Sequence, residues 1–220
     1  MNSQSPLPQP DWSIEQLCQH FGGVPADRIL LDPAPGTATE EMLLHLDSKR
    51  GYPLELLDGV GIDRIPGFRA SALTTQFLCR LMDFLSGDNR GIIIPGGKCP
   101  VRLRPGLVRL ASFYFINWNS IPGGIIPNDP ITDLIPDLVG DVISPWTSRT
   151  EMEWKQDQFF EAGTRLFGLL DLAEESIEVS TPRRTLHLGP EETLTGGDGL
   201  PGFAIPVKDI FAMPRRRAQE

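Results

Sequence analysis

The chain has 220 residues, a formal net charge of −9 and an apolar content of 40%. This length suits one domain with a substantial core. The acidic charge excludes a generic polyanion binder, although a local basic patch or a bound divalent ion could still meet DNA. Gly and Pro number 22 and 21, which predicts many turns but stays below the level typical of disorder.

The cysteines and the apolar runs indicate in which cellular compartment the protein is expected. Cys18, Cys79 and Cys99 are odd in number and show no C-x-x-C spacing. No signal peptide pattern is present, so a reducing cytoplasm is expected. No apolar run approaches the length of a membrane span, and we therefore expect no membrane partner.

The first 36 residues are interpreted as an N-terminal extension with one short helix. Residues 1–12 are polar and Pro-rich and are expected to form a tail. Ser13 and Gln16 form a capping box and Gly22-Gly23 a stop, which predicts a helix between them. The following residues to 36 read as an extended, Pro-bounded connection.

Residues 37–212 are predicted to form the main domain, followed by a tail over 213–220. Its early elements are a capping-box helix over 37–46, two strands over 53–58 and 60–65 joined by an Asp-Gly hairpin turn, and a long helix over 69–86. Strands are then expected over 91–95, 100–104, 107–116 and 136–144, a helix over 148–163, strands over 165–172, 176–180 and 185–188, and a helical turn over 207–212. This order predicts an α/β or α+β fold, with a central mixed sheet flanked by helices 69–86 and 149–163.

Two of the predicted strands are apolar on both faces, which is typical of central strands. The strand over 107–116 contains Ser112 as its only small polar residue. The strand over 136–144 carries Asp141 on the same face as Val139 and Ile143. A carboxylate there costs free energy unless it is paired, hydrated or bound to a metal.

The helix that follows carries a second buried charge. Lys155 shares a face with Met152 and Phe159. One interpretation is a snorkelling lysine or a structural ion pair with Asp141. The other is a frame for metal-dependent phosphodiester chemistry, in which the lysine holds an attacking water or neutralises a scissile phosphate. Glu55 is the candidate second carboxylate, unless it is a plain solvent-facing residue.

A run of basic residues is a weaker candidate for nucleic-acid binding. Lys98, Arg102, Arg104 and Arg109 have no acid between them and could meet a DNA backbone. Charges on strand edges equally serve to block edge pairing. The three histidines are scattered, so a zinc site is not expected.

Several segments in order resemble the Uma-type family of bacterial restriction endonucleases, a branch of the PD-(D/E)XK nuclease superfamily. They are TATEEMLLHL, LELLDGVGIDR, GLVRLASFYFINWNSIPGG, PDLVGDVISP, EMEWKQDQFFEAGTRLFGLLDL and GGDGLPGFAIPVKDIFA. The resemblance covers roughly residues 37–212. It implies a restriction-endonuclease-like core and hydrolysis of DNA that depends on a divalent metal, Mg²⁺ or Mn²⁺.

The same resemblance assigns the site residues. Glu55 matches the glutamate of the E-L-hydrophobic-D-G strand, Asp141 stands in the place of a glutamate, and Lys155 matches the helix lysine. Asp141 and Glu55 would then be the metal ligands. Ser112 stands where the family has its metal-binding aspartate, and a neutral hydroxyl is a much poorer ligand for Mg²⁺.

The expected function is therefore a DNA endonuclease whose activity is weak or absent. The alternative is a non-catalytic homologue that keeps the fold and binds DNA or a protein partner. Asp63 and Asp137 are further carboxylates that could rescue a metal site. A homodimer is compatible with the resemblance, because members of such folds often pair.

Overall fold

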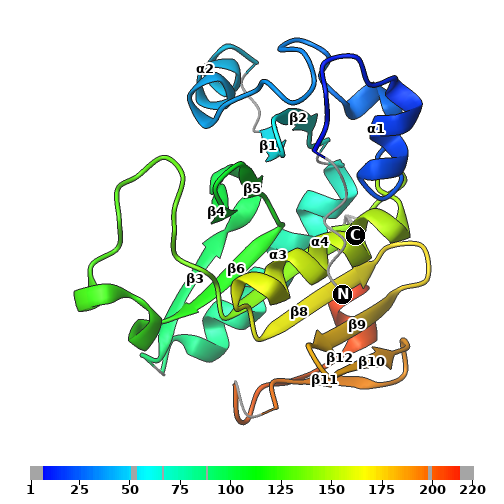
Figure 1. Cartoon of the computed structure of the whole chain (residues 1–220). Helices are drawn as coiled ribbons and strands as arrows, with labels where there is room; N and C mark the ends of the chain where they lie inside the picture. The colour runs from blue at the N-terminus through cyan, green and yellow to red at the C-terminus, as the bar shows by residue number, and fades with distance from the viewer. Residues whose placement is uncertain (1–6, 51–53, 66, 88, 198–199, 214–220) are drawn as a thin grey trace, which may run out of the picture.

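The computed structural model describes residues 7–50, 54–65, 67–87, 89–197 and 200–213. Two sheets organise this part of the chain (Figure 1): a four-stranded sheet of order β2-β1-β5-β4 and a six-stranded sheet of order β10-β9-β8-β7-β6-β3. A small hairpin of β11 and β12 lies near the C-terminus.

The helices are α1 (Ile14–His20), α2 (Glu40–Arg50), α3 (Phe68–Leu85), α4 (Arg149–Ala162) and α5 (Val207–Phe211), with short 3-10 helices η1 (Ala26–Arg28), η2 (Gly96–Lys98), η3 (Trp118–Ser120) and η4 (Pro122–Gly124). The strands are β1 (Leu54–Leu57), β2 (Val60–Asp63), β3 (Gly91–Pro95), β4 (Val101–Arg104), β5 (Leu107–Arg109), β6 (Phe113–Asn117), β7 (Leu138–Ile143), β8 (Leu166–Asp171), β9 (Ser176–Thr181), β10 (Arg184–Leu188), β11 (Thr193–Thr195) and β12 (Ala204–Pro206).

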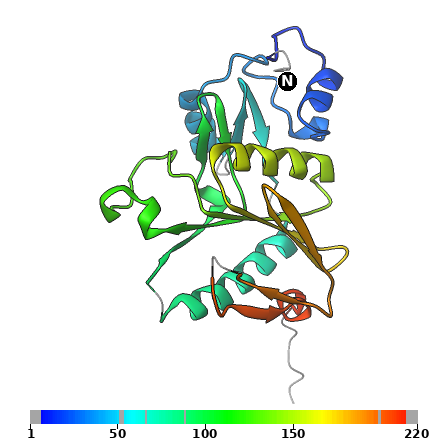
Figure 2. The same cartoon turned by 60° about the horizontal axis from the view of Figure 1, so that its bottom comes forward.

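The six-stranded sheet is the centre of the molecule and is mixed. β7 and β8 are parallel and are joined through α4, as a parallel pair requires a crossover; its other pairs are antiparallel. Helices α4 and α3 cover opposite faces (Figure 2). Phe113 packs with Phe77 of α3 on one face, and Tyr114 packs with Phe159 of α4 on the other. The predicted mixed sheet flanked by helices is confirmed.

The four-stranded sheet contains the predicted hairpin of β1 and β2. Asp58 and Gly59 form its turn and have φ values of 48° and 82°, as tight hairpins of this kind require. A Cβ at Gly59 would lie 2.5 Å from the carbonyl oxygen of Gly36, so a larger residue has no room. Helix α1 packs its buried Leu17 and Phe21 against this sheet.

The prediction of one continuous strand over 107–116 is wrong. The segment divides into β5 and β6, which belong to different sheets. Side-chain acceptors replace strand partners at the break, because the Leu110 amide donates to Glu55 and the Ala111 amide donates to the Tyr114 hydroxyl. Burial on both faces, the basis of the prediction, is nevertheless present along β5 and along β6 to Ile116.

The helix starts follow the predicted caps with two differences. The box of Ser13 and Gln16 forms in full. In the second helix Thr39, rather than Thr37, accepts from the Met42 amide, and α2 continues to Arg50 instead of ending near residue 46.

Ser148 and Glu151 stand at the spacing of a capping box at the start of α4, but the box forms only in part. Ser148 accepts from the Glu151 amide, but the Glu151 side chain turns away from the cap and is fully buried. The helical pattern places this glutamate beside or opposite the inward face that carries Lys155. The reason for the difference is Arg28 of the N-terminal extension, which binds the carboxylate through two hydrogen bonds of 2.7 and 2.9 Å.

The end of the chain, the tails and the cysteines complete the comparison with the sequence analysis. Between the strand predicted over 185–188 and the helical turn predicted over 207–212, where the sequence analysis proposes no element, the structure holds the hairpin of β11 and β12. Parts of both predicted tails, residues 1–6 and 214–220, lie outside the described residues. All three cysteines are free. No helix in the described part of the chain is long and apolar enough to cross a membrane.

The Arg28–Glu151 pair yields a stability prediction. Because both side chains are buried, replacing Glu151 by Ala leaves an uncompensated cation and should lower the free energy of unfolding by about 3–5 kcal/mol. Chemical denaturation followed by tryptophan fluorescence measures this change. Arg69→Ala is the matched control, since the Arg69–Glu175 pair is exposed and should cost less than about 1 kcal/mol.

The double variant Arg28→Met with Glu151→Leu separates the cost of an orphaned charge from the value of the pair. It should recover much of the loss, because no charge remains buried without a partner. A Glu151→Ala loss as small as that of Arg69→Ala would contradict the assigned role.

Candidate active site

The structure brings Glu55, Ser112, Asp141 and Lys155 together. Lys155 Nζ lies 2.9 Å from Glu55 Oε1 and 3.1 Å from Asp141 Oδ2. Ser112 Oγ donates to Asp141 Oδ1 at 2.7 Å. Lys155 also donates to the Leu110 carbonyl oxygen at 2.7 Å. Four residues that are far apart in the sequence thus form one hydrogen-bonded cluster.

The topology explains this convergence. Glu55 comes from β1 in the small sheet and Asp141 from the middle of β7 in the large sheet. Helix α4 directs Lys155 toward both carboxylates from the face that also carries Met152 and Phe159, and all three side chains are buried. Ser112 lies in the break between β5 and β6, where the chain passes from one sheet to the other.

Arg64 is a member of the cluster that sequence reasoning did not assign to the site. Its Nη2 lies 2.7 Å from Asp141 Oδ1 and 3.1 Å from Ser112 Oγ. The residue follows β2 directly. An arginine after a short strand is ordinary in a sequence, and no local signal distinguishes this one. Only the packing of the hairpin against β7 places its guanidinium beside Asp141.

Arg109, expected to meet DNA, lies in the interior. Its side chain is fully buried, with Nη1 donating to Glu55 Oε2 at 2.8 Å and Nε donating to Gln158 Oε1 at 2.7 Å. The guanidinium carbon lies 4.8 Å from the ring centre of Trp154, in a cation–π contact. Arg109 therefore neutralises Glu55 and does not face a nucleic-acid backbone.

The other basic candidates make no contact with the cluster that the described residues show. Arg102 and Arg104 belong to β4, an edge strand of the small sheet. Arg102 pairs with Glu40 and Asp133, and Arg104 pairs with Asp58. Lys98 is exposed in η2. The paired arginines are suited to blocking edge pairing, and their acids reduce the positive potential of this surface.

The cluster holds its carboxylates ionised. Burial by itself would raise the pKa of Glu55, but the cations of Lys155, Arg109 and Arg64 outweigh it and place the pKa far below the ordinary value. Burial opposes ionisation of Asp141 in the same way, and Arg64, Lys155 and the Ser112 hydroxyl hold its pKa below the ordinary range. Against the effect of burial, the two carboxylates raise the pKa of Arg64.

The donor set does not fit a divalent cation. Both oxygens of Glu55 and both oxygens of Asp141 already accept hydrogen bonds or ion pairs from the protein. Two carboxylates face three cations, so the cluster is net positive. Mg²⁺ and Mn²⁺ need free carboxylate oxygens, and within the described ranges no group of three His, Cys, Asp or Glu side chains could hold a metal.

An open cavity of about 370 Å³ leads to the cluster. Arg64, Ser112, Asp141 and Lys155 line it together with residues from the first turns of α3. The cavity is large enough for a phosphate-sized group and gives solvent access to a cluster that is otherwise buried.

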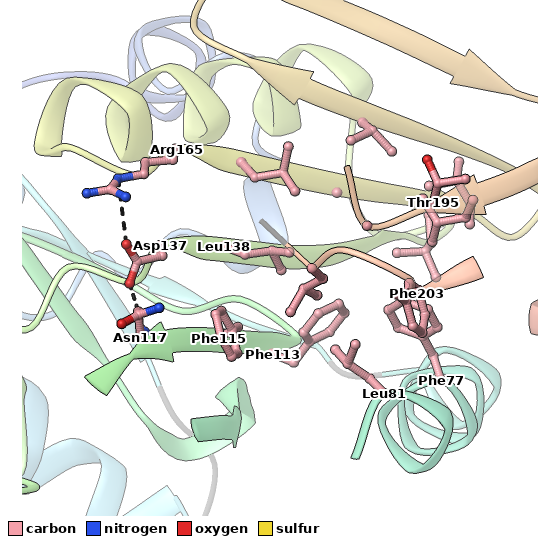
Figure 3. A pocket seen from close by; sticks show the side chains of 18 residues that line it. Phe77, Leu81, Phe113, Phe115, Asn117, Asp137, Leu138, Arg165, Thr195 and Phe203 are labelled. Carbon is pink, nitrogen blue, oxygen red and sulfur yellow. Dashed lines mark hydrogen bonds and ion pairs between the residues drawn. The ribbon is translucent and has the colours of Figure 1, made fainter. Parts of the chain in front are cut away.

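A second cavity of about 160 Å³ lies between the large sheet and α3, on the face away from Lys155 (Figure 3). Its walls are mainly aromatic and aliphatic side chains, among them Phe77, Phe113 and Phe203. Asp137 lies at its edge, where it accepts from the Asn117 amide and pairs with Arg165. Asp137 is therefore engaged at the far end of β7 from Asp141 and does not join the cluster.

Comparisons with known proteins bear on the family and the fold of this chain. The model of the Uma2 family, described as "Putative restriction endonuclease", matches residues 40–208. A crystal structure described as "a putative nuclease belonging to DUF820" from Anabaena variabilis ATCC 29413 superposes with a TM-score of 0.64 at 18% sequence identity, covering 74% of this chain and 92% of that one. At this identity the likeness shows the fold. Among curated protein sequences no match was found.

The depressed pKa values predict a stability profile in acid. Ionised Glu55 and Asp141 contribute stability at pH values above about 4, the unfolded pKa range, and this contribution is lost as the pH falls through their lower folded values. We expect the free energy of unfolding to decrease from about pH 5 to about pH 3. Urea denaturation at several pH values measures the decrease.

Asp141→Asn should reduce this acid-dependent decrease, because one of the two coupled carboxylates no longer titrates. Asp129→Asn, which changes an exposed carboxylate, is the control and should keep the wild-type profile. Identical profiles for the two variants would show that the buried cluster is not the source.

Proposed function

Because the chain belongs to the Uma2 family, we propose that it is a nuclease-fold protein that binds DNA without metal-dependent cleavage of the strand. The observation that carries this proposal is the contact of Arg64 with both Asp141 and Ser112. A guanidinium thus occupies the side of Asp141 at which the resemblance expects an aspartate and a divalent ion.

The loss of one carboxylate supports the proposal. Phosphodiester hydrolysis of this kind uses a bound metal to activate water and to stabilise charge on the phosphate. With Ser112 in place of an aspartate, Asp141 and Glu55 are the remaining acids of the cluster among the described residues. Both acids bind Lys155. Arg64 pairs with Asp141 and Arg109 pairs with Glu55, so both charges are neutralised further.

The residues of the cluster then have binding and positioning roles. Glu55 and Asp141 hold the Lys155 ammonium in the floor of the cavity, and Arg64 adds a second cation next to it. Cations at the base of an open cavity attract a phosphate of the DNA backbone. The acidic chain as a whole repels DNA, so binding would depend on this local charge.

A weakly active nuclease is the second candidate. Lys155 keeps the place that the resemblance gives to the catalytic lysine, and the Arg64 side chain is 17% exposed at the cavity. A metal ion that displaced Arg64 toward solvent would restore part of a catalytic arrangement. In this second candidate, DNA cleavage would depend on Mg²⁺ or Mn²⁺. The homodimer and the cytoplasmic location stay predictions from the sequence.

DNA cleavage and binding assays test the proposal. Wild-type protein, Lys155→Ala and Ser112→Asp are incubated with plasmid and linear DNA in Mg²⁺ and in Mn²⁺. We expect no cleavage by the wild type, and none by Ser112→Asp alone, because Arg64 would pair with the new carboxylate. Gel-shift titration should show that the wild type binds DNA, with binding that weakens as salt rises.

Lys208→Ala, which removes an exposed lysine, is the control for Lys155→Ala. Cleavage by the wild type that Lys155→Ala abolishes and Lys208→Ala preserves would contradict the proposal and favour the weakly active nuclease. Absence of DNA binding in every form would remove both nucleic-acid functions.

A further inference from the structure

Arg64 has hydrogen-bonding capacity that the protein does not use. A guanidinium carries five N–H donors in a planar fork. The Nη2 group serves Asp141 and Ser112. The Nη1 group is buried and, among the described residues, has no hydrogen-bond partner. Buried donors of this kind are uncommon in folded proteins. Because Arg64 also lines the open cavity, its unused donors point to an acceptor that comes from outside the chain.

The surroundings of Arg64 favour an anion as that acceptor. Asp141 is the only acid that lines the cavity in the described part of the chain, and it is bound by two cations. Arg28 also lines the cavity, but Glu151 neutralises it. Among the remaining charged residues that line the cavity, the two cations of Arg64 and Lys155 face the single carboxylate of Asp141, which leaves one positive charge in excess.

Helix α3 adds to the positive potential. Its first turn lines the cavity, contains no acidic residue, and receives no side-chain cap from Gly67. The amides at the start of an 18-residue helix carry a partial positive charge that favours anions. Ser71 and Thr74, which carry hydroxyl groups, also line the cavity. Arginine, amides and hydroxyls together are a usual donor set for phosphate.

We propose that Arg64 replaces the divalent cation of a nuclease site with a permanent guanidinium, and that the cavity binds one phosphate group of a nucleic acid without any metal. This inference rests on the proposed function and specifies its ligand chemistry. The two N–H donors of Arg64 Nη1 remain available for phosphate oxygens, and Lys155 supplies a second, more deeply buried charge.

Fluorescence polarisation with a labelled duplex tests the phosphate site. Binding of a 20-base-pair DNA, with and without a 5′-phosphate, is measured for wild type, Arg64→Gln and the control Arg80→Gln, in EDTA and in Mg²⁺. Wild-type binding should persist in EDTA and should not be strengthened by Mg²⁺, which competes for DNA phosphates as a counterion. Arg64→Gln should weaken binding about 10- to 100-fold and lower the salt slope by about one, whereas Arg80, exposed outside the cavity, should change little.

The two duplexes distinguish internal phosphodiesters from terminal phosphates. Equal dependence on Arg64 with both duplexes indicates a phosphodiester, and dependence only with the 5′-phosphate indicates a strand end. Thermal unfolding of Arg64→Gln and of Arg64→Lys shows whether the variants are folded; a folded Arg64→Lys should bind better than Arg64→Gln because it keeps the charge. Unchanged affinity and salt slope in folded Arg64→Gln would overturn the phosphate site while leaving DNA binding intact.

Calorimetric titration with Mn²⁺ tests whether Arg64 occupies the place of a divalent cation. Wild type and Ser112→Asp should show no saturable binding, whereas the double variant Arg64→Gln with Ser112→Asp should gain it. That variant has three carboxylates against two cations. Saturable Mn²⁺ binding by the wild type, or none by the folded double variant, would show that Arg64 does not hold the place of a metal.

Discussion

The ammonium of Lys155 joins the two sheets of this protein. Its three N–H donors match three acceptors: Glu55 from the small sheet, Asp141 from the large sheet, and the carbonyl of Leu110 between them. A buried charge is tolerated only with such complete pairing. The relative position of the hairpin, β7 and α4 therefore depends on this one group.

The same cluster explains how the chain can leave one sheet and enter the other. At Leu110 the backbone loses its strand partners, and unpaired buried backbone groups are costly. The Leu110 amide donates to Glu55 and its carbonyl accepts from Lys155. Both backbone groups at the break are thus satisfied by charged side chains, and the residues that look catalytic also complete the backbone hydrogen bonding of the fold.

A metal site and a structural ion cluster place opposite demands on the same carboxylates. A metal site requires free carboxylate oxygens, whereas a stable buried cluster requires every oxygen to be bonded. In this chain the second requirement is met: Ser112 is neutral, Arg64 covers Asp141, and Arg109 covers Glu55. A family member can therefore keep the buried lysine and its acids for structural reasons while the open cavity above them takes a different ligand.

The sequence by itself determined the helix starts, the Asp-Gly hairpin, the apolar central strands, and the membership of Glu55, Asp141 and Lys155 in one site, because capping, turn geometry, hydrophobic period and family motifs are local signals. Only the tertiary structure decided that the strand over 107–116 divides, that Arg109 is interior, and that Arg64 lies on Asp141. Those facts depend on how two sheets pack, and contacts between residues dozens of positions apart leave no mark in the local pattern. The charge balance of the site, on which the proposed binding of a phosphate in place of a metal ion rests, was decided there.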